Sequence, residues 1–367
     1  MSARRIVIKI GSSTLTGRSG GVDAAFVSGL ALQVDRVIRD GSQVVLVSSG
    51  AIAAGVERLG LAQKPSDMPS LQAAASVGQV ALVECYAASF AEFGIPVGQV
   101  LLTRNDTGHR ESFLHARDTF ERLLELGAVP IVNENDTVAV DEIRFGDNDT
   151  LAALVATMVN ADLVVLLSDI AGLYDSDPRL SDEATLLHQV DELTDDVMAA
   201  ATGVGSVMGS GGMVTKVEAA KMLMKAGIPM VICDGRRENV IVDAVAGLPV
   251  GTMFDGGEGT IGARKLWILL GGKAAGEVVI DEGACEALRV RRTSLLPAGV
   301  IGVRGEFNEG DFVALVDGAG SLVARGLSGM SSSDLRGVMG LKSGEIASVL
   351  PGATGTEVVH RDRLVVL

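Results

Sequence analysis

The sequence lacks any long uninterrupted apolar run, although 47% of its 367 residues are hydrophobic and the mean hydropathy is +0.36. Its apolar runs are short, as in LVVLL at 163–167, and none approaches the roughly 20 residues that a membrane-spanning helix needs. The excess comes from alanine and valine, which are typical of buried parallel strands and close-packed helices. We therefore expect a soluble chain with no membrane segment.

We expect neither a secretion signal at the N-terminus nor a disulfide or metal site built from cysteines. At the N-terminus, Lys9 interrupts the first apolar stretch well below the roughly 7–15 residues of a signal-peptide core. The three cysteines, Cys85, Cys233 and Cys285, show no metal-ligand or CxxC spacing, and each falls in an apolar pattern. We interpret them as buried thiols in a reducing compartment and predict a cytoplasmic protein.

Positive charge and histidine are scarce. The chain has 31 Lys+Arg against 46 Asp+Glu, a formal net charge of −15, which argues against nonspecific binding of nucleic acid over the whole surface. An anionic substrate would need a local positive pocket, so lysines near glycine-rich turns are informative. The four histidines, at 109, 115, 188 and 360, show no metal spacing and no partnered nucleophile, so we assign no residue as a metal ligand.

The order of apolar segments indicates an α/β fold. From residue 4 to about 255, short apolar strands alternate with helical patterns, and the strands are continuously apolar, which predicts a mostly parallel sheet covered by helices on both faces. In such sheets, ligands bind beyond the carboxyl ends of the strands. After the glycine-rich GGKAAG at 271–276, short strands separated by glycine turns predict a small, barrel-like β-rich domain.

Glycine-rich turns follow several of the predicted strands. The first strand delivers Lys9 and Gly11, which suit a phosphate, although a plain strand-to-helix turn explains them equally well. SSGAIAAG at 48–55 offers backbone N–H groups at a helix start, with a capped, closely packed helix as the alternative. GSGGMVTK at 209–216 opens a helix with Lys216 in its first turns, and we predict phosphate binding there.

Two familiar nucleotide-binding patterns do not fit. GSSTLTGRS at 11–19 is one residue too long for a P-loop, and Arg18 replaces the lysine. No GxGxxG occurs at a strand-to-helix turn, which weakens the case for a nicotinamide cofactor.

Acids and amides gather in VNENDTVAVDEIRFGDNDTLAALVA, residues 132–156. Asp136 follows a predicted strand, and Asn148 and Asp149 begin a predicted helix; helix capping explains only one of these residues. The helix N-terminus favours an ionised Asp149, which could pair with two phosphate-bound lysines. If the site transfers a phosphoryl group, the absence of a partnered histidine favours a carboxylate as the group that accepts it. A carboxylate is already ionised at neutral pH and needs no base, whereas a hydroxyl acceptor usually does.

Seven motifs in one order, VIKIGSS, SSGAIAAG, QVLLTR, VNEND, FGDND, DIAGLYDSDP and GSGGMVTK, closely resemble the bacterial glutamate 5-kinase family of the amino-acid kinase fold. SSGA for TSGA and GSGGM for GTGGM are conservative departures. The tail resembles a PUA domain, so that the resemblance covers nearly the whole chain. It implies a kinase domain at 1–270, a linker at 271–275 and a PUA-like domain at 276–367.

The resemblance implies transfer of a phosphoryl group from ATP to the side-chain carboxylate of L-glutamate, giving L-glutamyl 5-phosphate, the first step of proline biosynthesis. Lys9 and Lys216 would neutralise the phosphates, and Asp149 would orient the two lysines. Mg²⁺ would be carried with ATP. The residues implied in binding glutamate are Ser49, Asp136 and Asn148. Those implied in binding ATP are Lys9, Gly11, Ser168, Asp169, Ser210, Gly211, Gly212, Met213, Val214, Thr215 and Lys216.

Further properties of the family are implied with less detail. Its members are commonly homo-oligomers, dimers or tetramers, with proline as a feedback inhibitor. PUA domains resemble RNA-binding modules, but residues 276–367 carry 9 Lys+Arg against 12 Asp+Glu and lack a basic footprint, so we favour a structural or regulatory role. We expect the glycine-rich segment 203–212 to close over the substrate.

Two alternatives remain open at this point. One is another kinase of the same fold, with aspartate, acetylglutamate or UMP as the acceptor. The other is a non-catalytic amino-acid sensor, which the presence of Lys9, Asp149 and Lys216 disfavours.

Overall fold

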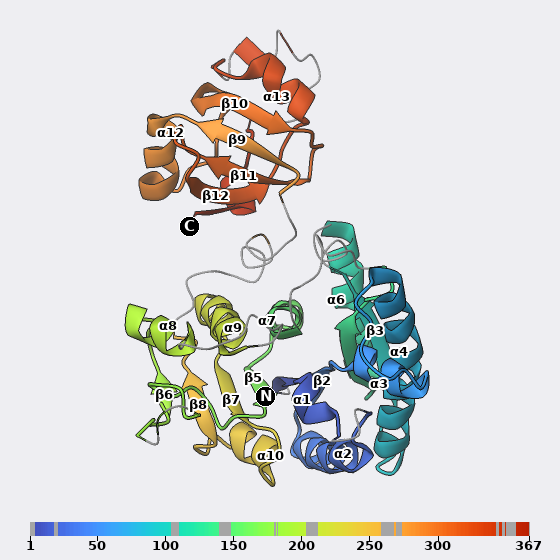
Figure 1. Ribbon diagram of the computed structural model, residues 1–367. Coiled ribbons are helices and arrows are strands. Elements are labelled where there is room, and N and C mark those ends of the chain that lie inside the picture. Colours follow the sequence, from blue (N-terminus) through green and yellow to red (C-terminus); the bar gives the residue numbers. More distant parts are fainter. Residues whose placement is uncertain are drawn as a thin grey trace. The chain divides into compact units, whose positions relative to one another are not determined.

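In a computed structural model, the chain divides into two units, residues 1–103 with 115–260 and residues 104–114 with 261–367, and each unit has its own sheet (Figure 1). The described residues are 4–17, 21–103, 110–138, 148–179, 181, 183–202, 212–257, 268, 274–342, 345–346, 349 and 357–366.

The first unit contains the predicted, mostly parallel sheet. Its strand order is β3-β4-β2-β1-β5-β7-β8-β6, and every pairing is parallel except that of β7 with β8. The strands are β1 (Arg5–Ile10), β2 (Gln43–Val47), β3 (Val97–Leu102), β4 (Val129–Glu134), β5 (Leu163–Ser168), β6 (Gln189–Val190), β7 (Met230–Asp234) and β8 (Gly251–Phe254). The prediction of an α/β sheet is confirmed.

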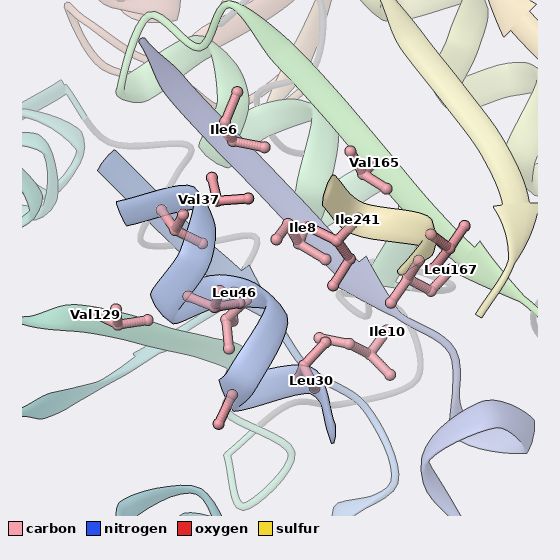
Figure 2. Close-up of a cluster of buried hydrophobic side chains, with 14 of the residues drawn as sticks. Ile6, Ile8, Ile10, Leu30, Val37, Leu46, Val129, Val165, Leu167 and Ile241 are labelled. Carbon is pink, nitrogen blue, oxygen red and sulfur yellow. The ribbon is translucent and has the colours of Figure 1, made fainter. Parts of the chain in front are cut away.

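Helices cover both faces of this sheet because successive strand residues point to opposite sides. On one face, Ile6, Ile8 and Ile10 of β1 pack with Leu30 of the helix Ala24–Arg39 and with Ile241 of the helix Val240–Val245 (Figure 2). The helices lying wholly or mostly in this unit are α1 (Ser12–Leu15), α2 (Ala24–Arg39), α3 (Ala51–Arg58), α4 (Met68–Ala91), α6 (Arg110–Glu125), α7 (Asn148–Met158), α8 (Asp195–Thr202), α9 (Met213–Ala226) and α10 (Val240–Val245). Helix α7 packs on β1, β5 and α9, and its residues from Leu151 to Met158 are all buried.

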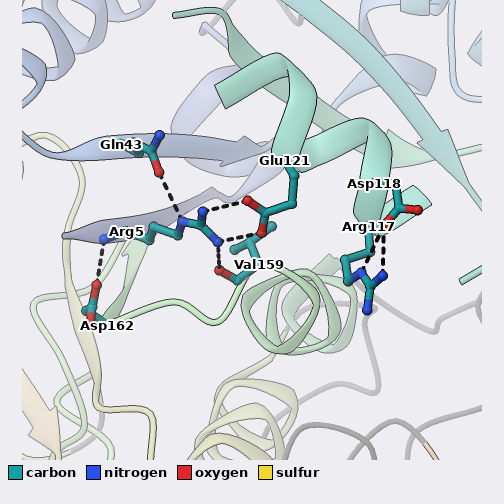
Figure 3. Close-up of polar contacts among 7 residues, drawn as sticks. All are labelled: Arg5, Gln43, Arg117, Asp118, Glu121, Val159 and Asp162. Atoms are coloured by element: carbon teal, nitrogen blue, oxygen red, sulfur yellow. Dashed lines mark hydrogen bonds and ion pairs between the residues drawn. The ribbon is translucent and has the colours of Figure 1, made fainter. Parts of the chain in front are cut away.

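Arg5 fixes the amino end of the central strand (Figure 3). Its guanidinium donates to both carboxylate oxygens of Glu121 on α6, each at 2.6 Å, and to the carbonyl oxygen of Val159 at 2.8 Å. It also donates to Gln43 Oε1 at 3.0 Å, and the Arg5 backbone N–H donates to Asp162 Oδ2 at 2.7 Å. Since a two-point arginine–carboxylate pair is geometrically specific, these contacts fix the start of β1 against its neighbours.

Helices α3 and α4 cross at very short range. A Cβ atom added at Gly55 would lie 1.7 Å from the Ala74 carbonyl oxygen, and one at Gly78 would lie 1.7 Å from the Ala51 carbonyl oxygen. Only glycine permits this approach. The crossing therefore sets the position of α4 relative to the start of α3.

Gly78→Ala should destabilise the protein by about 1–3 kcal/mol, because the new methyl group must force the two helix backbones apart. The matched control is Gly29→Ala on the exposed side of α2, where a Cβ would meet nothing within 4 Å. That change should be neutral or stabilising by about 0.5–1 kcal/mol. Urea unfolding of both variants measures this, and equal stabilities would contradict the close crossing.

Among the described helices, α4 is long and apolar enough by composition to cross a membrane, with a mean hydropathy of 1.2 over 18 residues. The sequence prediction rests on uninterrupted apolar runs, and polar residues such as Gln79 interrupt the runs of this helix. In this unit α4 packs against α2 and α3, and core helices of folded proteins have the same composition.

The cysteines are free thiols. Cys233 and Cys285 are buried as predicted, whereas Cys85, which lies on α4, is only half-buried. Burial raises the pKa of all three thiols, that of Cys233 to about 12. The thiols are therefore protonated at neutral pH.

The second unit is a small β-rich domain, as predicted. Its sheet has the order β10-β9-β11-β12-β13, antiparallel except for the parallel pair β9 and β11. The elements are β9 (Gly276–Ile280), α12 (Glu282–Glu286), a π-helix (Ala287–Arg291), a 3₁₀ helix (Pro297–Gly299), β10 (Val300–Gly305), β11 (Phe312–Val316), β12 (Leu322–Leu327), α13 (Ser332–Val338), a second 3₁₀ helix (Arg361–Arg363) and β13 (Leu364–Val366). Val278, Ile280, Val313 and Leu335 are among the buried residues of its separate core.

Candidate active site

A cavity of about 690 Å³ lies at the carboxyl ends of β1, β2, β4 and β5. These strands are neighbours in the sheet, so residues far apart in the sequence meet at one edge. The predicted site residues that line the cavity are Lys9, Gly11, Ser49, Asp136, Asn148, Ser168, Asp169 and Lys216.

Asp149 lies between two lysines that line this cavity. Its Oδ1 is 2.5 Å from Lys9 Nζ, and its Oδ2 is 3.4 Å from Lys216 Nζ. The exposed fractions are 0% for Asp149, 4% for Lys9 and 7% for Lys216. Residues from β1, α7 and α9 thus form one buried ion cluster, the pairing expected from the sequence.

Asp149 is held in its ionised form. Burial alone would raise the pKa of this carboxyl, but the charges of Lys9 and Lys216, with hydrogen bonds from Lys9 and Thr215, hold the pKa below its ordinary value. A buried cluster of two ammonium groups and one carboxylate keeps a net positive charge. Such a cluster suits an anion such as a phosphate placed beside it.

The start of α9 joins this cluster through its first turn. Gly212 is the N-cap in extended conformation, and the Thr215 hydroxyl lies 2.8 Å from the Gly212 carbonyl oxygen and 3.0 Å from Asp149 Oδ2. Met213 and Val214 are half-buried in the same turn. Among residues 212–216, which were predicted to bind ATP, Lys216 is the residue that lines the cavity.

Two sequence predictions lie outside the described residues. Ser210 and Gly211 belong to the predicted ATP-binding set, and residues 203–211 make up nearly all of the segment expected to close over the substrate.

The amide of Asn148 is tied into the wall of the cavity. Its Nδ2 donates toward the carbonyl oxygen of Ser48 at 2.6 Å, Ser49 Oγ at 3.0 Å and Asn133 Oδ1 at 2.9 Å. Asn148 and Ser49, predicted together as substrate-binding residues, are therefore in direct contact. Asp136 lies beyond the end of β4 and lines the same cavity.

Sequence reasoning missed Asn133, which lines the cavity, and two residues of α4 that contact Ser48 and Asn133. Asn133 stands inside the VNEND motif, yet only Asp136 was selected from it, although an amide at a strand end is the same kind of signal. Tyr86 and Gln79 lie on α4, in a helical pattern with no local sign of a site. Tyr86 OH is 3.0 Å from Ser48 Oγ, and burial raises the pKa of the phenol, so it stays protonated.

The chain matches known families over both units. The model described as "Amino acid kinase family" matches residues 4–234, and that of the PUA domain matches residues 276–350. A glutamate 5-kinase from Caldanaerobacter subterraneus subsp. tengcongensis is 44% identical over 363 residues, which are 99% of this chain and 98% of the relative. Another from Moorella thermoacetica is 45% identical over 365 residues, 100% of this chain and 97% of the relative.

A third relative, the glutamate 5-kinase of Citrifermentans bemidjiense, is 44% identical, with 99% of this chain and 98% of the relative covered. Among solved structures, a UMP kinase from Ureaplasma parvum matches 70% of this chain and 100% of its own, with a TM-score of 0.49 and 17% identity. The chain belongs to the amino acid kinase family, among its glutamate 5-kinases, and carries a PUA domain after the kinase domain.

Proposed function

We propose that this chain transfers the γ-phosphoryl group of ATP to the side-chain carboxylate of L-glutamate and so forms L-glutamyl 5-phosphate, the first step of proline biosynthesis. The observation that carries the proposal is the buried Lys9–Asp149–Lys216 cluster, whose two lysines line a cavity that Asn133 and Asn148 also line. Full-length relatives named glutamate 5-kinase support the choice of acceptor.

The transfer needs charge neutralisation more than acid–base chemistry. A carboxylate oxygen of glutamate attacks the γ-phosphorus, and the bond from that phosphorus to the bridging oxygen breaks, with its electron pair leaving on ADP. The side-chain carboxyl has an ordinary pKa of about 4.3, so no base is required. Lys9 and Lys216 would balance the charge that shifts toward the leaving oxygen, and Asp149 would position both ammonium groups.

Substrate binding would divide between the two ends of the cavity. Ser49, Asp136 and Asn148 would hold glutamate, with the Asp136 carboxylate as a partner for the α-ammonium group. Gly11, Ser168 and Asp169, at the ends of β1 and β5, would line the nucleotide site together with residues 210–216. Because the N-cap residue Gly212 has no side chain to accept from the first backbone N–H groups of the 14-residue helix α9, these groups can donate to phosphate oxygens.

Mg²⁺ would accompany ATP and supply further charge neutralisation on the phosphates when bound. Mg²⁺ prefers oxygen ligands and commonly takes only one or two carboxylates besides phosphates and water. The Asp169 carboxylate lines the cavity and fits that requirement. No step described above depends on the ion.

The remaining proposals concern the chain as a whole. We divide it into a kinase domain at 1–270, a linker at 271–275 and a PUA domain at 276–367. The net charge of the last part favours a structural or regulatory role over RNA binding. A cytoplasmic homo-oligomer inhibited by proline stays a prediction from the family.

Acyl phosphate trapped with hydroxylamine should form from ATP and L-glutamate, measured in parallel with L-aspartate and N-acetyl-L-glutamate. The last compound keeps the side-chain carboxylate but has no α-ammonium group, so pairing with Asp136 predicts at least about tenfold lower kcat/KM. Signal with another acceptor would redirect the substrate assignment. Silence with all three, from folded protein that binds ATP, would favour the amino-acid sensor.

A further inference from the structure

The orientation of the Asn148 amide is fixed by the protein. The carbonyl oxygen of Ser48 can only accept, so the atom 2.6 Å from it must be the amide nitrogen. That nitrogen has two hydrogens and three acceptors within 3.0 Å. Both hydrogens of the Asn148 amide are therefore donated to protein acceptors. Its oxygen, Oδ1, is the atom of this amide that remains to accept a hydrogen bond from a ligand in the cavity.

The orientation of Asn133 is fixed in the same way. The backbone N–H of Glu134 donates to Asn133 Oδ1 at 2.9 Å, so the other end of that amide is its nitrogen. Asn133 is 2% exposed, and its Nδ2 donates to Gln79 Oε1 at 2.9 Å. A chain of amides thus runs from Gln79 through Asn133 to Asn148.

Gln79 lies on α4 and has one buried polar atom without a partner among the described residues. It is 9% exposed, and among the described residues its Nε2 has no hydrogen-bond partner. A buried amide nitrogen without a partner costs free energy, which offsets the gain from the one hydrogen bond that Gln79 accepts from Asn133. The neighbouring Gly78 holds this part of α4 against Ala51, at the start of the helix that follows Ser49 and Gly50.

We propose that Gln79 is a positioning residue for the amino-acid substrate: it accepts from Asn133 and thereby holds Asn148 with its oxygen toward the substrate's ammonium group. The inference rests on the proposed function, in which Asn148 holds the amino acid. Gln79 acts only through Asn133. It should therefore affect amino-acid binding and leave the nucleotide and the phosphoryl transfer alone.

Gln79→Met in the full chain tests this, because methionine keeps the length and removes the acceptor. We expect the affinity for L-glutamate, measured by calorimetry, to fall about tenfold, as for the loss of one ordinary hydrogen bond. KM for L-glutamate should rise in parallel, while KM for ATP and kcat change by less than about twofold. Thermal unfolding should stay near that of the unmutated chain, since one buried unpaired amide nitrogen replaces another.

Two further variants separate positioning from general damage. Gln33→Met removes a glutamine on α2 whose oxygen accepts from the Ile241 N–H at 2.9 Å, and it should leave glutamate affinity unchanged. In an Asn133→Ala background, Gln79→Met should have no further effect, because the residue through which it acts is gone. Additive losses in that double variant would overturn the proposal.

The proposal also fails if Gln79→Met, folded, binds L-glutamate as the unmutated chain does, or if kcat falls as much as affinity. Failure of the proposed function is a separate result, in which the unmutated chain binds L-glutamate and forms no acyl phosphate. The affinity comparison still decides the role of Gln79 in that case. If the unmutated chain does not bind L-glutamate, both proposals fall.

Discussion

Lys216→Ala should lower kcat about 100- to 1000-fold, while the affinity for L-glutamate changes by less than about threefold. Lys216 is 7% exposed, its ammonium lies 3.4 Å from Asp149 Oδ2, and it lines the cavity. A charge aimed at the transferring phosphoryl group acts in the transition state and contributes little to binding of the acceptor. Hydroxylamine trapping gives kcat, and calorimetry gives glutamate affinity.

The control for Lys216→Ala is Lys221→Ala, which removes an exposed lysine from the same helix. It should keep kcat within about twofold, because water and salt screen an exposed charge, so that Lys221 has little effect on the transferring phosphoryl group. If Lys216→Ala keeps kcat within about threefold of the unmutated chain, the role of Lys216 in charge neutralisation is wrong. If it abolishes glutamate binding as well, the separation of the two ends of the cavity is wrong.

The cluster of Lys9, Asp149 and Lys216 could be predicted because it depends on a rule of topology. Lys9 is the second-last residue of β1, and Asp149 and Lys216 lie in the first turns of α7 and α9. The sequence pattern marks these strand ends and helix starts, and parallel strands bring such ends to one edge. Pairing of one acid with two lysines then follows from charge. The distances and the complete burial of Asp149 needed the packed structure.

Strand order could not be predicted, because apolar strands carry no label of their neighbours. In the sequence β8 follows a helix, as a parallel strand would, yet β8 runs antiparallel to β7. On its other side β8 pairs in parallel with β6, a strand of two residues that has no strand signal in the sequence. Gln79 was missed for a similar reason. Its contact is with a residue 54 positions away, and its helix reads as an ordinary apolar core helix.

Asp149→Asn should destabilise the protein at pH 7 by about 3–5 kcal/mol, because it leaves two buried ammonium groups without their counter-charge. The folded-state pKa of Asp149 lies below its ordinary value, so its contribution is complete above the unfolded pKa of about 3.9. The contribution is lost as the pH falls through the folded pKa. The stability difference between the two proteins should therefore be constant from pH 7 to about pH 5 and shrink at more acid pH.

Urea unfolding of both proteins across this pH range measures the difference. The control is Asp177→Asn, which removes a carboxylate whose pKa is also low, about 2, through its hydrogen bonds and charge pairing with Arg179. The Asp177 side chain is largely covered, but its partner Arg179 is exposed, so water screens the pair, and the substitution should change stability much less than Asp149→Asn at pH 7. If Asp149→Asn changes stability no more than Asp177→Asn, then Lys9 and Lys216 do not need the charge of Asp149 to remain buried in the folded protein. A difference that grew toward acid pH would contradict the low pKa, since a group that binds its proton more readily when folded adds stability only as the pH falls.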